Sequence, residues 1–135
     1  MKKYITITTC LIASAMGLLS LHKKNRADIS PAELLNAKWK VINIQYKIID
    51  NDVNISAHDY IGSPTDYMAF TNNNKIYRLI HSVKDVVPYI LISENKILCD
   101  EDTIIIKKLT DQYCTLNLRN GSKNNYTEQV INLKK

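Results

Sequence analysis

Eight short runs of alternating or β-branched residues, separated by turn-forming residues, constrain the fold of this chain most. Runs of this length at roughly ten-residue spacing indicate an all-β sandwich or barrel. The connections are short, so consecutive strands should pair, and closing the meander removes its exposed edges. We therefore predict an all-β fold, an eight-stranded antiparallel up-and-down barrel. The predicted strands cover residues 39–49, 66–71, 75–83, 86–92, 97–99, 103–109, 114–119 and 126–133.

The first run begins at Trp39, the only Trp of the chain, and a short helix should precede it. Ser30 can cap that helix, Pro31 suits its first position, and Glu33 occupies the third position of a capping box. The helix must be short because the sequence turns β-branched from Trp39 onward. In the strand that follows, alternation places several side chains on one face, namely Ile42, Ile44, Tyr46 and Ile48.

Two later stretches give specific expectations. Residues Asp50–Thr65 hold many turn formers and little periodicity, which predicts a long irregular loop, and such loops are often functional. In the third run, alternation places Tyr77 and His81 on one face together with Leu79 and Val83.

The N-terminus has the features of a secretory signal peptide. Lys2 and Lys3 precede an apolar run over residues 4–21, and small residues near its end suit a signal peptidase. The run is also just long enough to span a bilayer, and basic residues follow it, as in an uncleaved anchor. We expect a signal peptide or membrane anchor over 1–21, a linker over 22–29 and the barrel domain over 30–135. Contact with a membrane is then expected only through the N-terminal segment, if it stays uncleaved.

A third interpretation makes Cys10 a lipid attachment site. Thr9 stands where a lipobox has a small residue such as Gly or Ala, and most of the apolar run lies after Cys10, so the match is poor. All three interpretations place the folded part outside the cytoplasm, in the periplasm or cell envelope.

If Cys10 leaves with the signal peptide, Cys99 and Cys114 remain, and an exported pair invites a disulfide. The predicted strand order argues against one, because the two residues lie near opposite ends of the strand between them. That separation exceeds the roughly 7 Å limit between bridged Cα atoms. We predict two buried, unpaired thiols that pack as small apolar side chains.

Several short motifs occur in a characteristic order along the chain. A Leu-Asn-Ala-Lys-Trp stretch opens the series, and a strand ending in Phe before an Asn-rich hairpin follows it. The full set is Leu35–Trp39, Tyr67–Asn73, Tyr89–Leu91, Ile106–Asp111 and Leu116–Leu118. In this order the motifs resemble the small lipocalin-like domains of exported proteins from Bacteroidetes-type bacteria, over about residues 34–133. Ala37 replaces a Gly usual in that family, and the family's hairpin Gly is also missing. The resemblance implies a barrel with possible ligand binding but no particular substrate, and by analogy Trp39 would plug the closed end.

The aromatic composition points to an amphipathic interior. The chain has eight Tyr and one Phe, and Tyr combines an apolar ring with a polar tip. The candidate lining residues are Tyr46, Met68, Phe70, Tyr77, His81, Tyr89 and Leu116. The alternative is that these side chains simply fill the barrel. Trp39 is expected to be structural in either case.

The sequence holds no constellation of residues that carries chemistry. His58 and His81 do not share a metal-ligand spacing, and residues 50–54 start like a calcium loop without its turn Gly or bidentate Glu. A Ser elbow, a Gly-rich phosphate loop and a paired-Cys motif are missing. We expect no catalytic residue, no metal, no cofactor and no enzymatic activity. The net charge of +5 is scattered along the sequence apart from residues 23–26, so we expect no nucleic-acid partner.

Two functions fit these observations. An exported barrel that binds a small hydrophobic or amphipathic molecule should contain an open apolar cavity. An envelope protein-interaction module, such as an assembly factor, an inhibitor or an immunity-type protein, should have a filled barrel with an exposed apolar patch. The second function would use the Asp50–Thr65 stretch or the outer face of the barrel.

Overall fold

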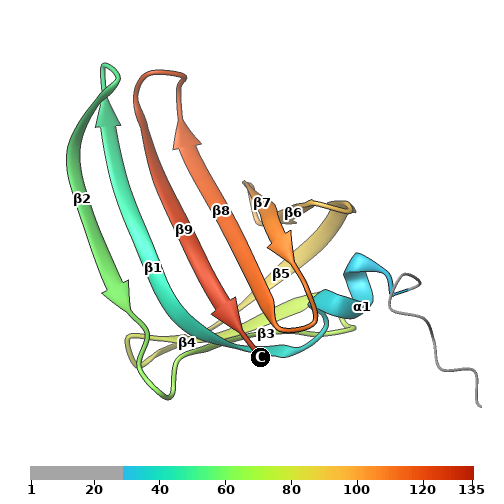
Figure 1. Cartoon of the computed structure of the whole chain (residues 1–135). Helices are drawn as coiled ribbons and strands as arrows, with labels where there is room; N and C mark the ends of the chain where they lie inside the picture. Colours follow the sequence, from blue (N-terminus) through green and yellow to red (C-terminus); the bar gives the residue numbers. More distant parts are fainter. Residues whose placement is uncertain (1–28) are drawn as a thin grey trace, which may run out of the picture.

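The computed structural model describes residues 29–135, which form one short helix and nine antiparallel strands (Figure 1). The elements are α1 (Pro31–Leu35), β1 (Lys38–Asp50), β2 (Val53–Ile61), β3 (Tyr67–Phe70), β4 (Lys75–Ile80), β5 (Val83–Ser93), β6 (Lys96–Cys99), β7 (Asp102–Leu109), β8 (Tyr113–Gly121) and β9 (Tyr126–Lys134). In Figure 1 the long strands β2, β1, β9 and β8 rise side by side, while β3 and β4 cross below them and β5 climbs behind them toward β6.

Eight of the nine strands form a closed ring. Each strand from β3 to β8 pairs with the next strand along the chain, and β1 pairs with both β3 and β9. These eight strands correspond one by one to the eight predicted runs. The predicted eight-stranded antiparallel up-and-down barrel with a short N-terminal helix is therefore confirmed.

The ninth strand, β2, corrects the prediction of an irregular loop. Val53–Ile61 pairs with β1 after a tight turn in which Asn51 and Asp52 have φ angles of 47° and 64°. All residues from Val53 to Asp59 are exposed. Since neither face of this part of β2 is covered, the strand needs no alternation of apolar and polar residues, and its sequence shows none.

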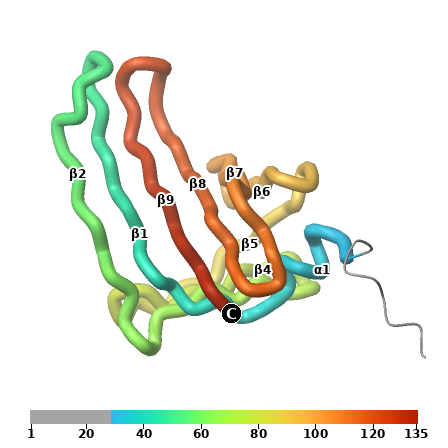
Figure 2. The backbone as a smooth tube through the Cα atoms, viewed as in Figure 1, coloured from blue at the N-terminus to red at the C-terminus, as the bar shows by residue number. Residues whose placement is uncertain are grey.

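The ring is complete only at its lower end, because β1 uses one edge for two partners. Lys38–Lys40 pair with β3, whereas Asn43–Asp50 pair with β2 along the same edge. Figure 2 shows β1 and β2 diverging from β3, β4 and β5 above this junction. The barrel is thus narrow at the bottom and splayed at the top.

A bulge in β1 corrects the predicted face of that strand. The pairing of β1 with β9 skips Ile42, so Ile42 is an extra residue in the ladder. Trp39 and Val41 are buried before the bulge and Ile44 after it, whereas Ile42 is 40% exposed. The bulge resets the alternation, which periodicity alone could not indicate.

The lower end of the barrel is filled by a packed layer, called the floor from here on. Trp39 is fully buried in it, and its indole Nε1 donates a hydrogen bond to the Leu35 carbonyl at 2.9 Å. Helix α1 holds Leu35 in place, and the predicted capping box of Ser30 and Glu33 is confirmed. The floor side chains are each at most 2% exposed: Leu35, Trp39, Val41, Ile44, Met68, Phe70, Ile76, Ile97, Cys114, Leu116 and Leu133.

The prediction of two buried, unpaired cysteines is also confirmed. Cys99 and Cys114 are both buried and free. Cys99 pairs with Asp102 and Cys114 with Leu109, so the two thiols lie at opposite ends of β7. Burial raises the pKa of both thiols, and that of Cys114 to about 12.

Within residues 29–135 no helix has the length and apolar character needed to cross a bilayer. The predicted signal peptide or anchor, the Cys10 site and all of the linker except Ile29 lie outside the described residues.

Candidate ligand-binding cup

Above the floor, the inner faces of β1, β2, β8 and β9 carry side chains that stay half-buried or exposed, and this part of the barrel is called the cup here. Alternation from the buried Ile44 places Tyr46 and Ile48 on this inner face. Tyr46 pairs with His58 of β2 on one side and with Gln129 of β9 on the other. Gln129 in turn pairs with Leu118 of β8. The wall residues are half-buried or exposed: Tyr46, Ile48, His58, Leu118 and Gln129.

The wall combines apolar surface with polar edges. The rings of Tyr46 and His58 stack with centroids 4.7 Å apart and planes 11° apart. The Ile48 side chain, next on the same face, is 41% exposed. An apolar molecule lying on this wall would cover surface that the protein itself leaves in contact with water.

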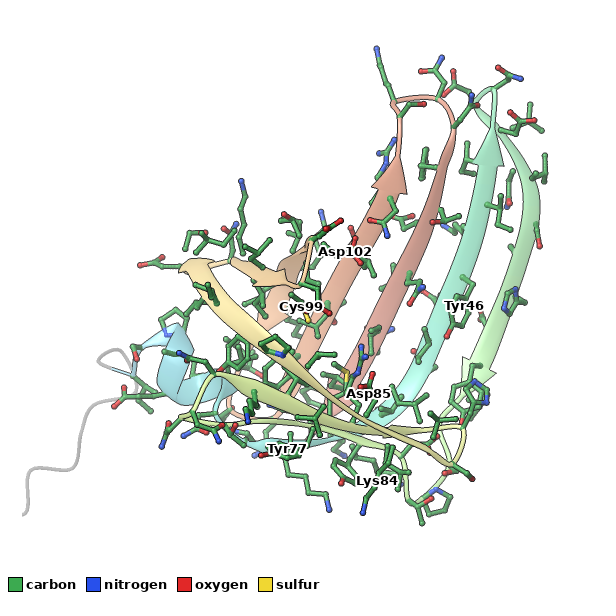
Figure 3. All side chains as sticks on the ribbon, turned by 180° about the vertical axis from the view of Figure 1, so that it is seen from behind. Tyr46, Tyr77, Lys84, Asp85, Cys99 and Asp102 are labelled. Atoms are coloured by element: carbon green, nitrogen blue, oxygen red, sulfur yellow. The ribbon has the colours of Figure 1, made fainter. Side chains whose placement is uncertain are left out.

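The opposite side of the cup carries an ion pair. Arg78 of β4 pairs in register with Asp85 of β5, and their side chains form a salt bridge. In Figure 3 Asp85 lies on the concave side of these strands, whereas Tyr77 and Lys84 point away from it. The Arg78 guanidinium holds the pKa of Asp85 below its ordinary value. Both side chains remain partly exposed, at 33% and 42%, so a polar group of a ligand could contact them.

A polar cluster braces the rim of the cup, where β2 ends. The ring of Tyr60 packs on that of His81 with centroids 3.7 Å apart, and the Tyr60 hydroxyl donates a hydrogen bond to Asp66 Oδ2. The backbone N–H of Ser63 donates to the same oxygen at 2.9 Å. Asp66 is 1% exposed, and its Oδ1 has no hydrogen-bond partner among residues 29–135.

These contacts set the acidity of the cluster. Burial alone would raise the pKa of Asp66, but the hydrogen bonds from Tyr60 and Ser63 and the nearby His81 outweigh it, so the pKa lies below its ordinary value. The hydrogen bond to Asp66 raises the pKa of Tyr60. The cluster therefore anchors the loop between β2 and β3 with a carboxylate that stays ionised.

Four of the seven candidate lining residues belong to the packed lower part of the barrel: Met68, Phe70, Tyr89 and Leu116. Tyr89 is 8% exposed and packs edge-to-face on Phe70, with ring centroids 5.5 Å apart. Its hydroxyl donates to the Thr71 carbonyl at 3.3 Å, and burial raises its pKa. These side chains fill the barrel, while Tyr46 faces the open cup.

The predicted inward face of Tyr77 and His81 is wrong. Strand β4 ends at Ile80, and His81–Ser82 form a turn with φ angles of 53° and 64°, so His81 lies at the rim. Ile76 is buried and Arg78 shares its face, which leaves Tyr77 37% exposed on the outer side. Arg78 lies on the inner face of β4, where its charge is paired with Asp85. A charged residue in the sequence made this inner face look like the outer one.

The two histidines within residues 29–135 each contact a different aromatic ring. His58 stacks on Tyr46 and His81 on Tyr60. Over the part of the chain that the structure describes, no three potential metal ligands gather.

Sequence reasoning missed the Arg78–Asp85 pair and the Tyr60–Asp66 contact. The first left a usable signal, because opposite charges at matching positions of a predicted hairpin suggest a cross-strand pair. The second left none, because it depends on the strand β2, which the sequence pattern did not indicate.

No family model matches the sequence, and no curated protein matches it. Among solved structures, the chain is similar to a deswapped triple mutant of bovine odorant binding protein. The two chains share 16% sequence identity with a TM-score of 0.47, over 76% of this chain and 74% of that chain. Similarity at this level assigns no function, so the function must come from the cup itself.

Proposed function

We propose that this protein is an exported lipocalin-like barrel that binds a small hydrophobic or amphipathic molecule in the cup. The observation that carries the proposal is the contrast between the closed floor and the open wall above it. Interior positions of a small barrel normally cover one another. Here the inner side chains above the floor are left partly exposed, and Ile48 is 41% exposed.

The cup favours a ligand with an apolar body and a polar end. The apolar body would lie against Ile48, Leu118 and the ring of Tyr46, and each Å² of apolar surface removed from water contributes about 25 cal/mol. The polar end would reach the Arg78–Asp85 pair, which is partly exposed on the facing strands. A purely apolar ligand would desolvate that pair without replacing its contacts with water.

Export to the periplasm or cell envelope is part of the proposal. The basic start and apolar run of residues 1–21 support it. Cell fractionation with an antibody against the barrel domain tests it, and recovery of the protein with the cytoplasmic markers would contradict it.

The test of ligand binding is titration with a fluorescent fatty-acid probe. Ile48→Lys places a charge in the cup and should weaken probe binding by about tenfold or more, since burying an unpaired ammonium is costly. Ile90→Lys is the matched control, because Ile90 is 60% exposed and lies on the outer face of β5. Equal affinity of the two variants, or no uptake by the unaltered protein, would contradict the proposal.

A second candidate function is an envelope protein-interaction module, and strand β2 favours it. The outer edge of β2 pairs with no other strand within residues 29–135. Val53, Ile55 and Ile61 are 60%, 60% and 71% exposed. A long edge strand with exposed apolar residues can pair with an extended segment of another chain.

Photo-crosslinking in the producing cells separates this function from the first. A crosslinker at position 55 of β2 should capture one discrete protein, and Ile61→Lys should abolish that product. A crosslinker at position 83 is the control, because Val83 is 65% exposed on β5. The same products from both positions would exclude β2 as a specific interface.

A further inference from the structure

A second concave site lies on the outside of the barrel, at its lower end. It is a pocket of about 460 Å³, called the lysine pocket here. Four lysines line it together with one acidic and several neutral residues: Lys38, Lys40, Lys134 and Lys135, with Pro64, Thr65, Asp66, Tyr67 and Leu79.

Strand register brings the lysines together from the two ends of the domain. Lys40 of β1 pairs directly with Lys134 of β9 and, on its other side, with Tyr67 of β3. Lys38 lies two residues before Lys40 and therefore shares its outward face. Charges that are scattered along the sequence thus form one cluster in the fold.

The four lysines of the lysine pocket are not neutralised by ion pairs within residues 29–135. The salt bridge of the cup joins other residues. Lys38 lies over the Tyr67 ring at 4.0 Å, and Lys135 lies over the Trp39 ring at 4.7 Å. The one carboxylate of the wall, Asp66, is buried and already accepts hydrogen bonds from Tyr60 and Ser63.

The clustered lysines lower the stability of the protein when no ligand is bound. Like charges directly opposite each other on neighbouring strands are destabilising, and Lys40 faces Lys134 in that way. Residues that break such a local rule are most often found at functional sites. An anion between the two ammonium groups would remove the repulsion.

The geometry points to a binding site for a phosphate group carried by a small organic molecule. A phosphate monoester has a charge of about −1.5 to −2 at neutral pH, which matches several ammonium groups better than a single carboxylate does. Lysine binds phosphate as a point charge without needing a fixed bidentate geometry. Pro64, Tyr67 and Leu79 provide a less polar wall for the organic part. The lysine pocket lies outside the cup, and this inference does not depend on the function proposed for the cup.

The experiment uses the full chain at low ionic strength. Binding of phenyl phosphate is measured by calorimetry, and binding to phosphatidylcholine vesicles with and without phosphatidic acid is measured by co-sedimentation. The test variant is Lys40→Gln with Lys134→Gln. The matched control is Lys96→Gln with Lys123→Gln, which removes the same charge from exposed positions outside the lysine pocket.

The test variant should bind at least about tenfold more weakly than the unaltered protein, because two charge-assisted contacts are lost. The control variant should bind within about twofold, since only long-range attraction changes. Without ligand, the test variant should unfold at a higher temperature than the unaltered protein, because the repulsion across β1 and β9 is gone. This rise in the unfolding temperature also shows that the test variant is folded.

Saturable binding of phenyl phosphate supports a free organic phosphate as the ligand. Binding confined to phosphatidic acid vesicles supports a lipid headgroup, which carries the same phosphate chemistry. If both variants bind the probe equally weakly, the attraction comes from the overall positive charge and not from the lysine pocket, and the proposed site is overturned. Lack of binding to both probes would overturn it as well.

Discussion

Replacing Trp39 with Ala tests the floor most severely. The side chain is fully buried, and a buried aromatic of this kind removes about 150–250 Å² from water. At about 25 cal/mol per Å², that area corresponds to about 4–6 kcal/mol as an upper limit. Large aromatic deletions in cores cost about 3–5 kcal/mol in practice. We expect Trp39→Ala to lower the free energy of unfolding by that amount.

Urea denaturation followed by far-UV circular dichroism measures the loss, since the variant has no Trp fluorescence. With a denaturant slope of about 2 kcal/mol/M, the midpoint should fall by about 2 M. Trp39→Phe separates two contributions, because it keeps most of the ring and leaves the Leu35 carbonyl without its Nε1 donor. It should cost about 1–3 kcal/mol. A loss below about 1 kcal/mol for Trp39→Ala would mean that Trp39 does not hold the floor together.

Three further predictions concern Asp66, the two buried cysteines and Gly62. The lowered pKa of Asp66 means that its charge stabilises the fold above its unfolded pKa of about 4, and this contribution disappears as the pH falls through the lower folded value. Asp66→Asn should therefore flatten the fall in the free energy of unfolding as the pH drops below about 4, and an unchanged profile would refute this role. In a Cys10→Ser background, Ellman's reagent should react slowly with the native protein because Cys99 and Cys114 are buried, and it should report both thiols only after unfolding; fast native reaction would contradict the burial. Gly62→Ala should lower the free energy of unfolding by about 1–3 kcal/mol, because a Cβ there would meet the Val41 carbonyl oxygen at 2.1 Å; an unchanged unfolding temperature would show that the backbone adjusts freely.

The barrel could be predicted from sequence because its strands bury one face each. Leu116 and Leu133 alternate with more exposed residues, and the turn at Asn74, with φ at 58°, separates β3 from β4. Strand β2 could not be predicted, because its side chains face water on both sides from Val53 to Asp59. A strand with neither face buried leaves no alternation of apolar and polar residues in the sequence.

The candidate site was predicted only in part. Tyr46 was found because it continues the apolar face of β1, but Met68 and Phe70 turned out to fill the floor. The ring of strands is closed only where β1 pairs with β3, and it opens where β1 pairs with β2 instead. The position of this change of partner decides which interior residues are covered. The lysine pocket was hidden for a similar reason, since the pairing of Lys40 with Lys134 depends on register across the closed ring.

Native mass spectrometry of the protein, purified gently from the cells that produce it, shows whether the cup holds a small molecule. A small-molecule mass should be retained under native conditions, disappear on denaturation and be absent from Ile48→Lys. A clean ligand-free mass, together with no uptake of a fluorescent fatty-acid probe, would contradict ligand binding in the cup and direct attention to the exposed strand β2.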